Sequence, residues 1–113
     1  MIKIRVEKGQ EVMATLTEEC KKRDIKNAAI VTLFGAVDEC CISTMPKEDA
    51  MSDILTEYKE PLELSGTGEI ADGKPHVHCT LGRQGDIAIT GHLHWGKVQC
   101  WFINAYLIEL VDP

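Results

Sequence analysis

The feature that most constrains the fold is a pair of short histidine motifs on either side of a glycine-containing turn. All four histidines of the chain lie in His76-Val77-His78 and His92-Leu93-His94. Side chains at positions i and i+2 point to the same face of an extended strand, but not of a helix. The turn between Gly82 and Gly85 predicts that the two segments are antiparallel neighbours in a hairpin. The motifs therefore predict a β-sheet that carries imidazoles on one face.

A symmetric turn would oppose His76 to His92 and His78 to Thr90, with His78 on the diagonal from His92. We therefore predict that His76, His78 and His92 form a site for zinc or another divalent transition metal, because imidazole suits these ions. His94 lies further along the same face, as a fourth ligand or as a group that orients the others. The alternative is that each motif is a pair of polar residues on a solvated or hydrogen-bonded face.

Three neutral imidazoles would leave the full charge of a dication in place, with one coordination position open. We expect such a position to bind a small anion, for example a carboxylate or a phosphate, or to lower the pKa of a bound water. A hydrolase would also need a general base. Glu63, Glu69 and Asp86 are the candidates, but the default interpretation of each is a solvated carboxylate. The residues therefore leave open whether the protein is an enzyme.

The rest of the chain predicts one helix followed by many strands. Residues 2–6 alternate as a first strand, and residues 10–23 have the apolar stripe of an amphipathic helix. Residues 46–53 are polar and predict a loop. The other expected strands span 28–34, 37–45, 54–58, 61–70, 76–81, 86–93 and 98–111. This order indicates an α+β fold with a mostly antiparallel sheet and one main N-terminal helix, in a single domain of residues 1–113.

Charge and cysteine content limit the partners and the compartment. The chain has 12 basic and 18 acidic residues, a net charge of -6, which opposes non-specific binding to DNA and to anionic membranes. Its five cysteines form no CxxC and are typical of reduced thiols in a cytoplasmic protein. Cys79 shares the parity of Val77 and Leu81, which indicates a core residue and not a ligand. No run approaches the ~20 apolar residues of a membrane span.

Several motifs in the C-terminal half resemble the PPC (plants and prokaryotes conserved) domain. The matching segments are Gly66-Thr67-Gly68-Glu69-Ile70, Pro75-His76-Val77-His78 with Leu81, and Gly91-His92-Leu93. The first strand, the helix and Leu33-Phe34-Gly35-Ala36 also fit the family. Thr90 stands where the family pattern has the first glycine of Gly-Gly-His-Leu, and His94 is additional.

The resemblance implies an α+β subunit that forms a homotrimer and can carry a metal at His76, His78 and His92. Plant members of the family join the domain to AT-hooks and act as nuclear DNA-binding regulators, and prokaryotic members often carry a DNA-binding label. The chain has no AT-hook and is acidic, so its sequence gives DNA little support. Two alternatives to a metal-binding domain remain. One is a DNA-associated regulator whose trimer is a protein-interaction platform, and the other is a structural trimer whose histidines line a polar channel or interface.

Overall fold

Eight strands and one helix make up the fold in the computed structural model, which describes residues 1–111. The strands pair in the order β1-β8-β2-β5-β6-β7-β3-β4, and every pairing is antiparallel. This arrangement confirms the predicted α+β class. The elements are β1 (Ile2–Val6), α1 (Val12–Lys22), β2 (Ala28–Val37), β3 (Glu39–Thr44), β4 (Ile54–Tyr58), β5 (Leu62–Ala71), β6 (Lys74–Arg83), β7 (Ile87–Lys97) and β8 (Ile103–Glu109).

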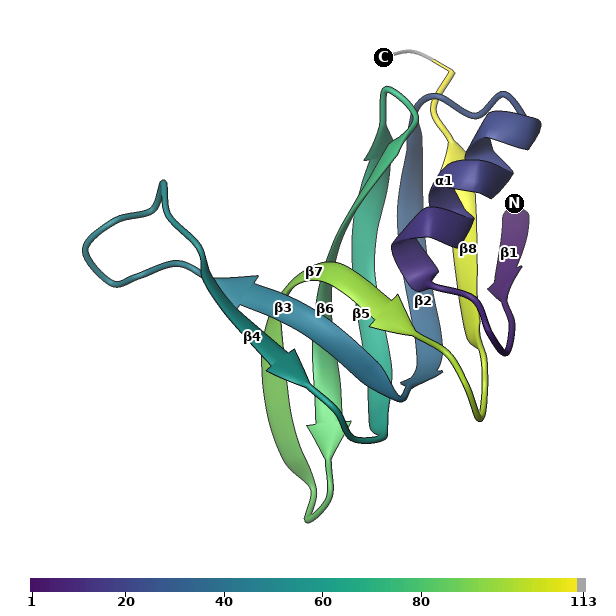
Figure 1. Cartoon of the computed structure of the whole chain (residues 1–113). Coiled ribbons are helices and arrows are strands. Elements are labelled where there is room, and N and C mark those ends of the chain that lie inside the picture. Colours follow the sequence, from purple (N-terminus) through teal and green to yellow (C-terminus); the bar gives the residue numbers. More distant parts are fainter. Residues whose placement is uncertain (112–113) are drawn as a thin grey trace.

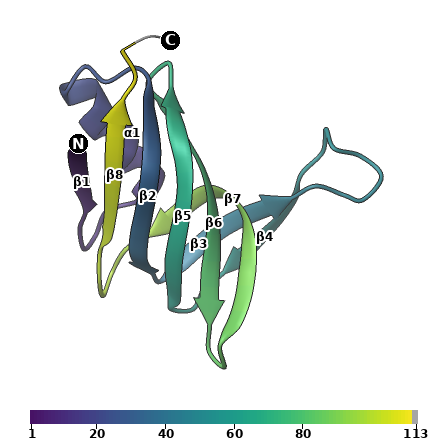
Figure 2. The same ribbon diagram turned by 180° about the vertical axis from the view of Figure 1, so that it is seen from behind.

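The sheet bends at β7, because the two halves of this strand pair with different neighbours. Residues from Ile87 to His92 pair with β6, whereas those from His92 to Lys97 pair with β3. The β3–β4 hairpin therefore turns across the end of the sheet, and its loop projects outward (Figure 1). The helix α1 lies over one face, and the view from behind shows no helix on the opposite face of β8, β2 and β5 (Figure 2).

The helix packs on the sheet through the stripe that the sequence predicts. Val12, Leu16 and Cys20 are buried. The carboxylate of Glu11 caps the first turn by accepting from the backbone N–H groups of Met13 and Ala14. It also accepts from the N–H of Gly96, which ties the helix to β7. Among the described residues, no helix has the length and apolar character needed to cross a membrane.

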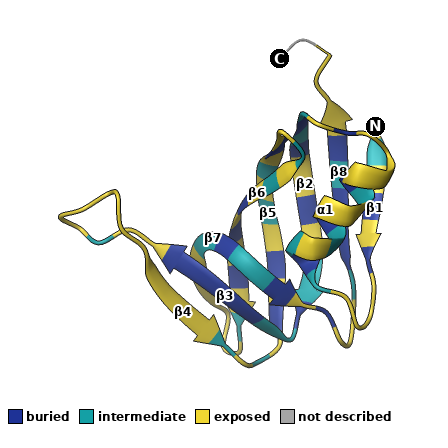
Figure 3. Ribbon diagram, turned by 45° about the horizontal axis from the view of Figure 1, so that its top comes forward, coloured by how far each residue is buried: buried dark blue, intermediate teal, exposed yellow. Residues whose placement is uncertain are grey.

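The core lies between the helix-bearing face of the sheet and the elements folded over it, and the strands alternate between buried and exposed residues (Figure 3). Cys20, Cys40, Cys41 and Cys79 are buried free thiols, which confirms the predicted burial of Cys79, and Cys100 is exposed. Burial raises the pKa of the Cys79 thiol to about 12, with a further contribution from Cys40. Cys79 is therefore a packing residue, as its parity predicts.

Two predictions near the C-terminus are wrong. The last strand begins at Ile103 and not at residue 98, because residues 98–102 form a turn in which the Asp38 carboxylate accepts from the backbone N–H groups of Gln99 and Cys100. The strand β7 runs to Lys97, beyond its predicted end at residue 93, and Gly96 lies within it. A side chain at Gly96 would press on Val37 of β2, so the glycine permits close packing there.

Candidate metal centre

Three histidines meet on the sheet face that points away from the core. His76 and His78 come from β6, on either side of the buried Val77, and His92 comes from β7 directly opposite His78. Their ring centroids are 5.1 Å apart for His76–His78, 4.6 Å for His76–His92 and 5.6 Å for His78–His92. One ring nitrogen from each lies within 4.8 Å of the other two. The structure thus brings together the set that the sequence predicts.

The predicted register of the β6–β7 hairpin is wrong by two residues, but the prediction that the histidines share one face of the sheet is right. The structure pairs His78 with His92 and Thr80 with Thr90, and the last pair before the turn is Arg83 with Ile87. The turn is therefore centred on Gly85, beyond the midpoint that the sequence predicts. A shift of two preserves the side-chain face, because the period of a strand is two. The cluster survives since His76 approaches His92 along the diagonal.

His94 lies beside the cluster but outside the group of three. Its ring centroid is 4.7 Å from that of His92. Its Nε2 atom lies 2.7 Å from the hydroxyl oxygen of Ser43, a buried residue of β3. This hydrogen bond holds the ring toward β3, and the group of three nitrogens within 4.8 Å of one another does not include His94. Both predicted roles of His94, as a fourth ligand or as a group that orients the others, stay predictions.

Close backbone packing sets the positions of the histidine strands. A Cβ atom at Gly68 of β5 would collide with the carbonyl oxygen of His76, and one at Gly91 would lie 2.7 Å from the carbonyl oxygen of Ser43. Of the two residues before His92, Gly91 is therefore the one whose place has no room for a side chain. Thr90 fits without strain, and its hydroxyl donates to the carbonyl of Cys79 at 2.9 Å. The departure from the family pattern at Thr90 does not disturb the site.

The donor set suits a divalent transition metal. In tetrahedral zinc sites the nitrogens lie about 2.0–2.1 Å from the ion, so they are roughly 3.3 Å from one another. The nitrogens lie within 4.8 Å of one another, so rotations of the three side chains would bring them to that spacing around an ion. Burial lowers the pKa of His92, and the neighbouring His76, His94 and His78 lower it further, whereas Asp53 opposes the shift. A lowered pKa favours the neutral imidazole, the form that binds metal.

A hollow lies on each side of His78. The first, of about 350 Å³, is lined by Thr67, Gly68, Glu69, His76 and His78. The second, of about 340 Å³, reaches from His78 and His92 to the β3–β4 loop, and its lining is Ser43, Thr44, Met45, Ala50, Asp53, His78, Thr90, Gly91 and His92. The ligand cluster therefore opens toward two spaces that a small molecule could enter.

Of the three carboxylates considered from the sequence, only Glu69 lies beside the histidines, opposite His76 on β5. Glu63 and Asp86 line another hollow near Arg83 and Trp101. Sequence reasoning missed Ser43 and Asp53, which reach the site from β3 and from the β3–β4 loop. No motif marks either residue, and their proximity depends on the pairing of β3 with β7, which sets Ser43 opposite His92.

Together, the fold and the site define an α+β domain with a fully antiparallel sheet and a three-imidazole cluster on its open face. A family model for the Plants and Prokaryotes Conserved (PCC) domain, the family abbreviated PPC above, matches residues 1–111. The chain therefore belongs to the PCC domain family. A comparison with curated proteins found no significant match.

Solved structures of similar fold come from archaea and bacteria. A plant- and prokaryote-conserved protein from Pyrococcus horikoshii is 29% identical, with a TM-score of 0.79 over 96% of this chain and 79% of that protein. A metal-containing protein from Archaeoglobus fulgidus is 28% identical, with a TM-score of 0.74 over 96% and 79%. A Ralstonia eutropha protein described as a "putative DNA-binding protein" is 20% identical, with a TM-score of 0.83 over 97% and 78%, and shows the likeness of fold alone.

Proposed function

We propose that the protein binds a divalent transition metal, with zinc as the first candidate, through His76, His78 and His92. The observation that carries the proposal is the convergence of one nitrogen from each imidazole within 4.8 Å. The likeness to a metal-containing protein from Archaeoglobus fulgidus supports it. The buried free thiols are typical of a reducing compartment, which supports a cytoplasmic location.

The residues of this chain would hold the metal from one side and leave the other side open. When bound, the ion would supply positive charge at the mouth of both hollows, which attracts a small anionic group. His78 lines both hollows and so would stand between two approaches to the ion. We propose that the function is the binding of a small ligand at this open position.

The test is a zinc titration against a competing chelator, with each histidine replaced in turn by glutamine. We expect His76→Gln, His78→Gln and His92→Gln each to weaken zinc binding by about 100-fold or more, because each removes one coordinating nitrogen. His94→Gln is the comparison: it removes a ring beside His92 and not a proposed ligand, so it should weaken zinc binding less, by about tenfold. Equal affinities in all four variants would contradict the proposal.

We also propose that the protein self-associates as a homotrimer through the sheet face that no helix covers. Val31 and Phe34 of β2 are both 45% exposed on the monomer, and Ile108 of β8 is 47% exposed. Asn104 lies beside Phe34 in the sheet, and its Oδ1 atom is buried without a hydrogen-bond partner among the described residues. A second copy packed on this face would cover the apolar side chains and could donate to that oxygen.

DNA binding is the weaker candidate. The net charge of -6 opposes attraction to phosphates, and neither hollow beside the histidines is lined by a lysine or an arginine among the described residues. A gel shift at low salt tests this candidate. Salt-sensitive binding there would favour a regulatory role over the proposed ligand-binding one.

A further inference from the structure

We propose that the ligand of this site is a small, unphosphorylated carboxylic acid with an amino or hydroxyl group next to its carboxylate. The inference rests on the proposed metal site and deepens it, because it assigns the chemistry of the spaces on both sides of the histidines. Volumes of about 350 Å³ and 340 Å³ lie near the lower end of ligand pockets, so each hollow suits a small molecule.

The charge of the two hollows is the first argument. Each is lined by one carboxylate, Glu69 on the β5 side and Asp53 on the side of the β3–β4 loop. Neither carboxylate forms an ion pair with any residue that the structure describes. Within one subunit both negative charges are therefore unpaired, and each would attract a positively charged or hydrogen-bond-donating group of a ligand.

The hydrogen-bonding groups are the second argument. Glu69 and Asp53 accept only, and the nearby threonine hydroxyls, Thr67 in one hollow and Thr90 in the other, add further polar contacts. A ligand in either hollow therefore gains most by presenting N–H or O–H donors to the carboxylate. An amino group next to the metal-bound carboxylate of the ligand would meet that requirement, and so would a hydroxyl.

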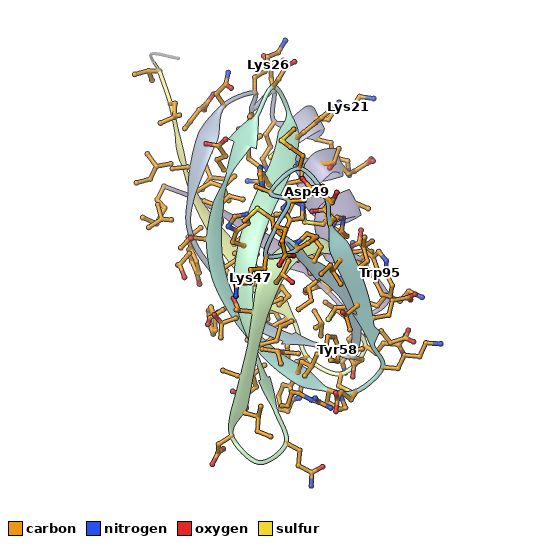
Figure 4. All side chains as sticks on the ribbon, turned by 90° about the vertical axis from the view of Figure 1, so that its left-hand side faces the viewer. Lys21, Lys26, Lys47, Asp49, Tyr58 and Trp95 are labelled. Carbon is orange, nitrogen blue, oxygen red and sulfur yellow. The ribbon has the colours of Figure 1, made fainter. Side chains whose placement is uncertain are left out.

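The same charges disfavour phosphate. A phosphate group carries up to two negative charges and is usually held by lysine or arginine. Here the dication would have two carboxylates nearby, and the linings contain no basic side chain besides the histidines. Lys47 belongs to the projecting β3–β4 loop and is not part of either lining (Figure 4). A zwitterionic or singly charged acid matches the site better than a phosphate ester.

The test uses full-length protein loaded with cobalt(II), whose visible spectrum reports ligands that enter the coordination sphere. The probes are glycine, glycolate, acetate and inorganic phosphate, and metal content is measured before and after each titration. We expect glycine or glycolate to bind at least about tenfold more tightly than acetate or phosphate. In Asp53→Asn and Glu69→Gln, removal of one negative charge should tighten phosphate binding about three- to tenfold and reduce the preference for the amino or hydroxy acid.

The matched controls are Glu48→Gln, in the same loop as Asp53, and Glu63→Gln, on the same strand as Glu69. Both lie outside the two linings and should leave all four affinities unchanged. The proposal would be overturned if phosphate bound the wild type as tightly as glycine and glycolate do. It would also be overturned if phosphate bound and Lys47→Gln abolished that binding. Failure to bind cobalt at all would instead overturn the proposed metal site, before any probe is added.

Discussion

At the scale of single residues, the site depends on contacts between strands that are distant in sequence. Ser43 and His94 are the clearest pair, because their hydrogen bond of 2.7 Å joins β3 to the histidine strand β7. Ser43 is buried and His94 is half-buried, so the bond is partly shielded from water. Its expected role is to fix the ring of His94 and, through it, the position of His92.

Replacing Ser43 by alanine should lower the free energy of unfolding by about 0.5–1.5 kcal/mol, because a partly buried imidazole nitrogen loses its partner. A double-mutant cycle with His94→Gln, measured by urea unfolding, separates this interaction from packing effects. A coupling free energy near zero between the two substitutions would show that the hydrogen bond contributes nothing.

The pKa of His92 predicts how the metal-free protein responds to pH. Burial lowers that pKa below the value in the unfolded chain, so the unfolded chain binds more protons through the histidine range. The free energy of unfolding should therefore fall as the pH drops from about 7.5 through the unfolded histidine value of about 6.5. Urea unfolding of the metal-free protein between pH 5 and 8 measures this slope, and His92→Gln should reduce it. If the wild type and His92→Gln have the same slope, His92 does not cause the pH dependence.

At the scale of the elements, the glycines decide how closely neighbouring strands approach. Gly91→Ala should lower the free energy of unfolding by about 1–3 kcal/mol, since its Cβ atom would lie 2.7 Å from the carbonyl oxygen of Ser43 and force β3 and β7 apart. The same substitution should also lower the affinity for zinc, because His92 is the next residue and would move with the strand. Thermal unfolding and zinc titration measure the two effects.

Gly82→Ala is the control for that prediction. Gly82 lies in the same hairpin, but the nearest atoms to a Cβ there are 3.9 Å away. Its substitution should change the free energy of unfolding by less than about 0.5 kcal/mol. Equal losses in the two variants would show that the close approach of Gly91 to β3 is unimportant.

The elements also show what the sequence could and could not predict. Strand parity placed His76, His78 and His92 on one face, because parity is unaffected by a shift of two residues. The register itself depended on the turn around Gly85, whose backbone geometry the glycine pattern did not determine. Asp53 was beyond prediction, because its place beside His92 depends on the pairing of β3 with β7 and on a loop without a motif.

At the scale of the whole molecule, the uncovered sheet face predicts that a charge placed on it will prevent self-association. If the protein forms the proposed trimer, Phe34→Glu would bury a carboxylate in the interface and should convert that trimer to a monomer. Native mass spectrometry of the untagged protein counts the subunits. Leu55→Glu is the control, because Leu55 is 59% exposed on the edge strand β4 and lies outside the proposed face. A Phe34→Glu protein that remains trimeric would place the interface elsewhere.

The central claim is that three imidazoles hold a metal, and zinc-edge X-ray absorption of the zinc-loaded protein tests it most directly. The claim predicts three histidine nitrogens at about 2.0–2.1 Å, one further light ligand and no sulfur. The His76→Gln variant, loaded in the same way, should lose one imidazole from the spectrum. Sulfur at about 2.3 Å, or a spectrum with fewer than three imidazoles in the wild type, would contradict the claim.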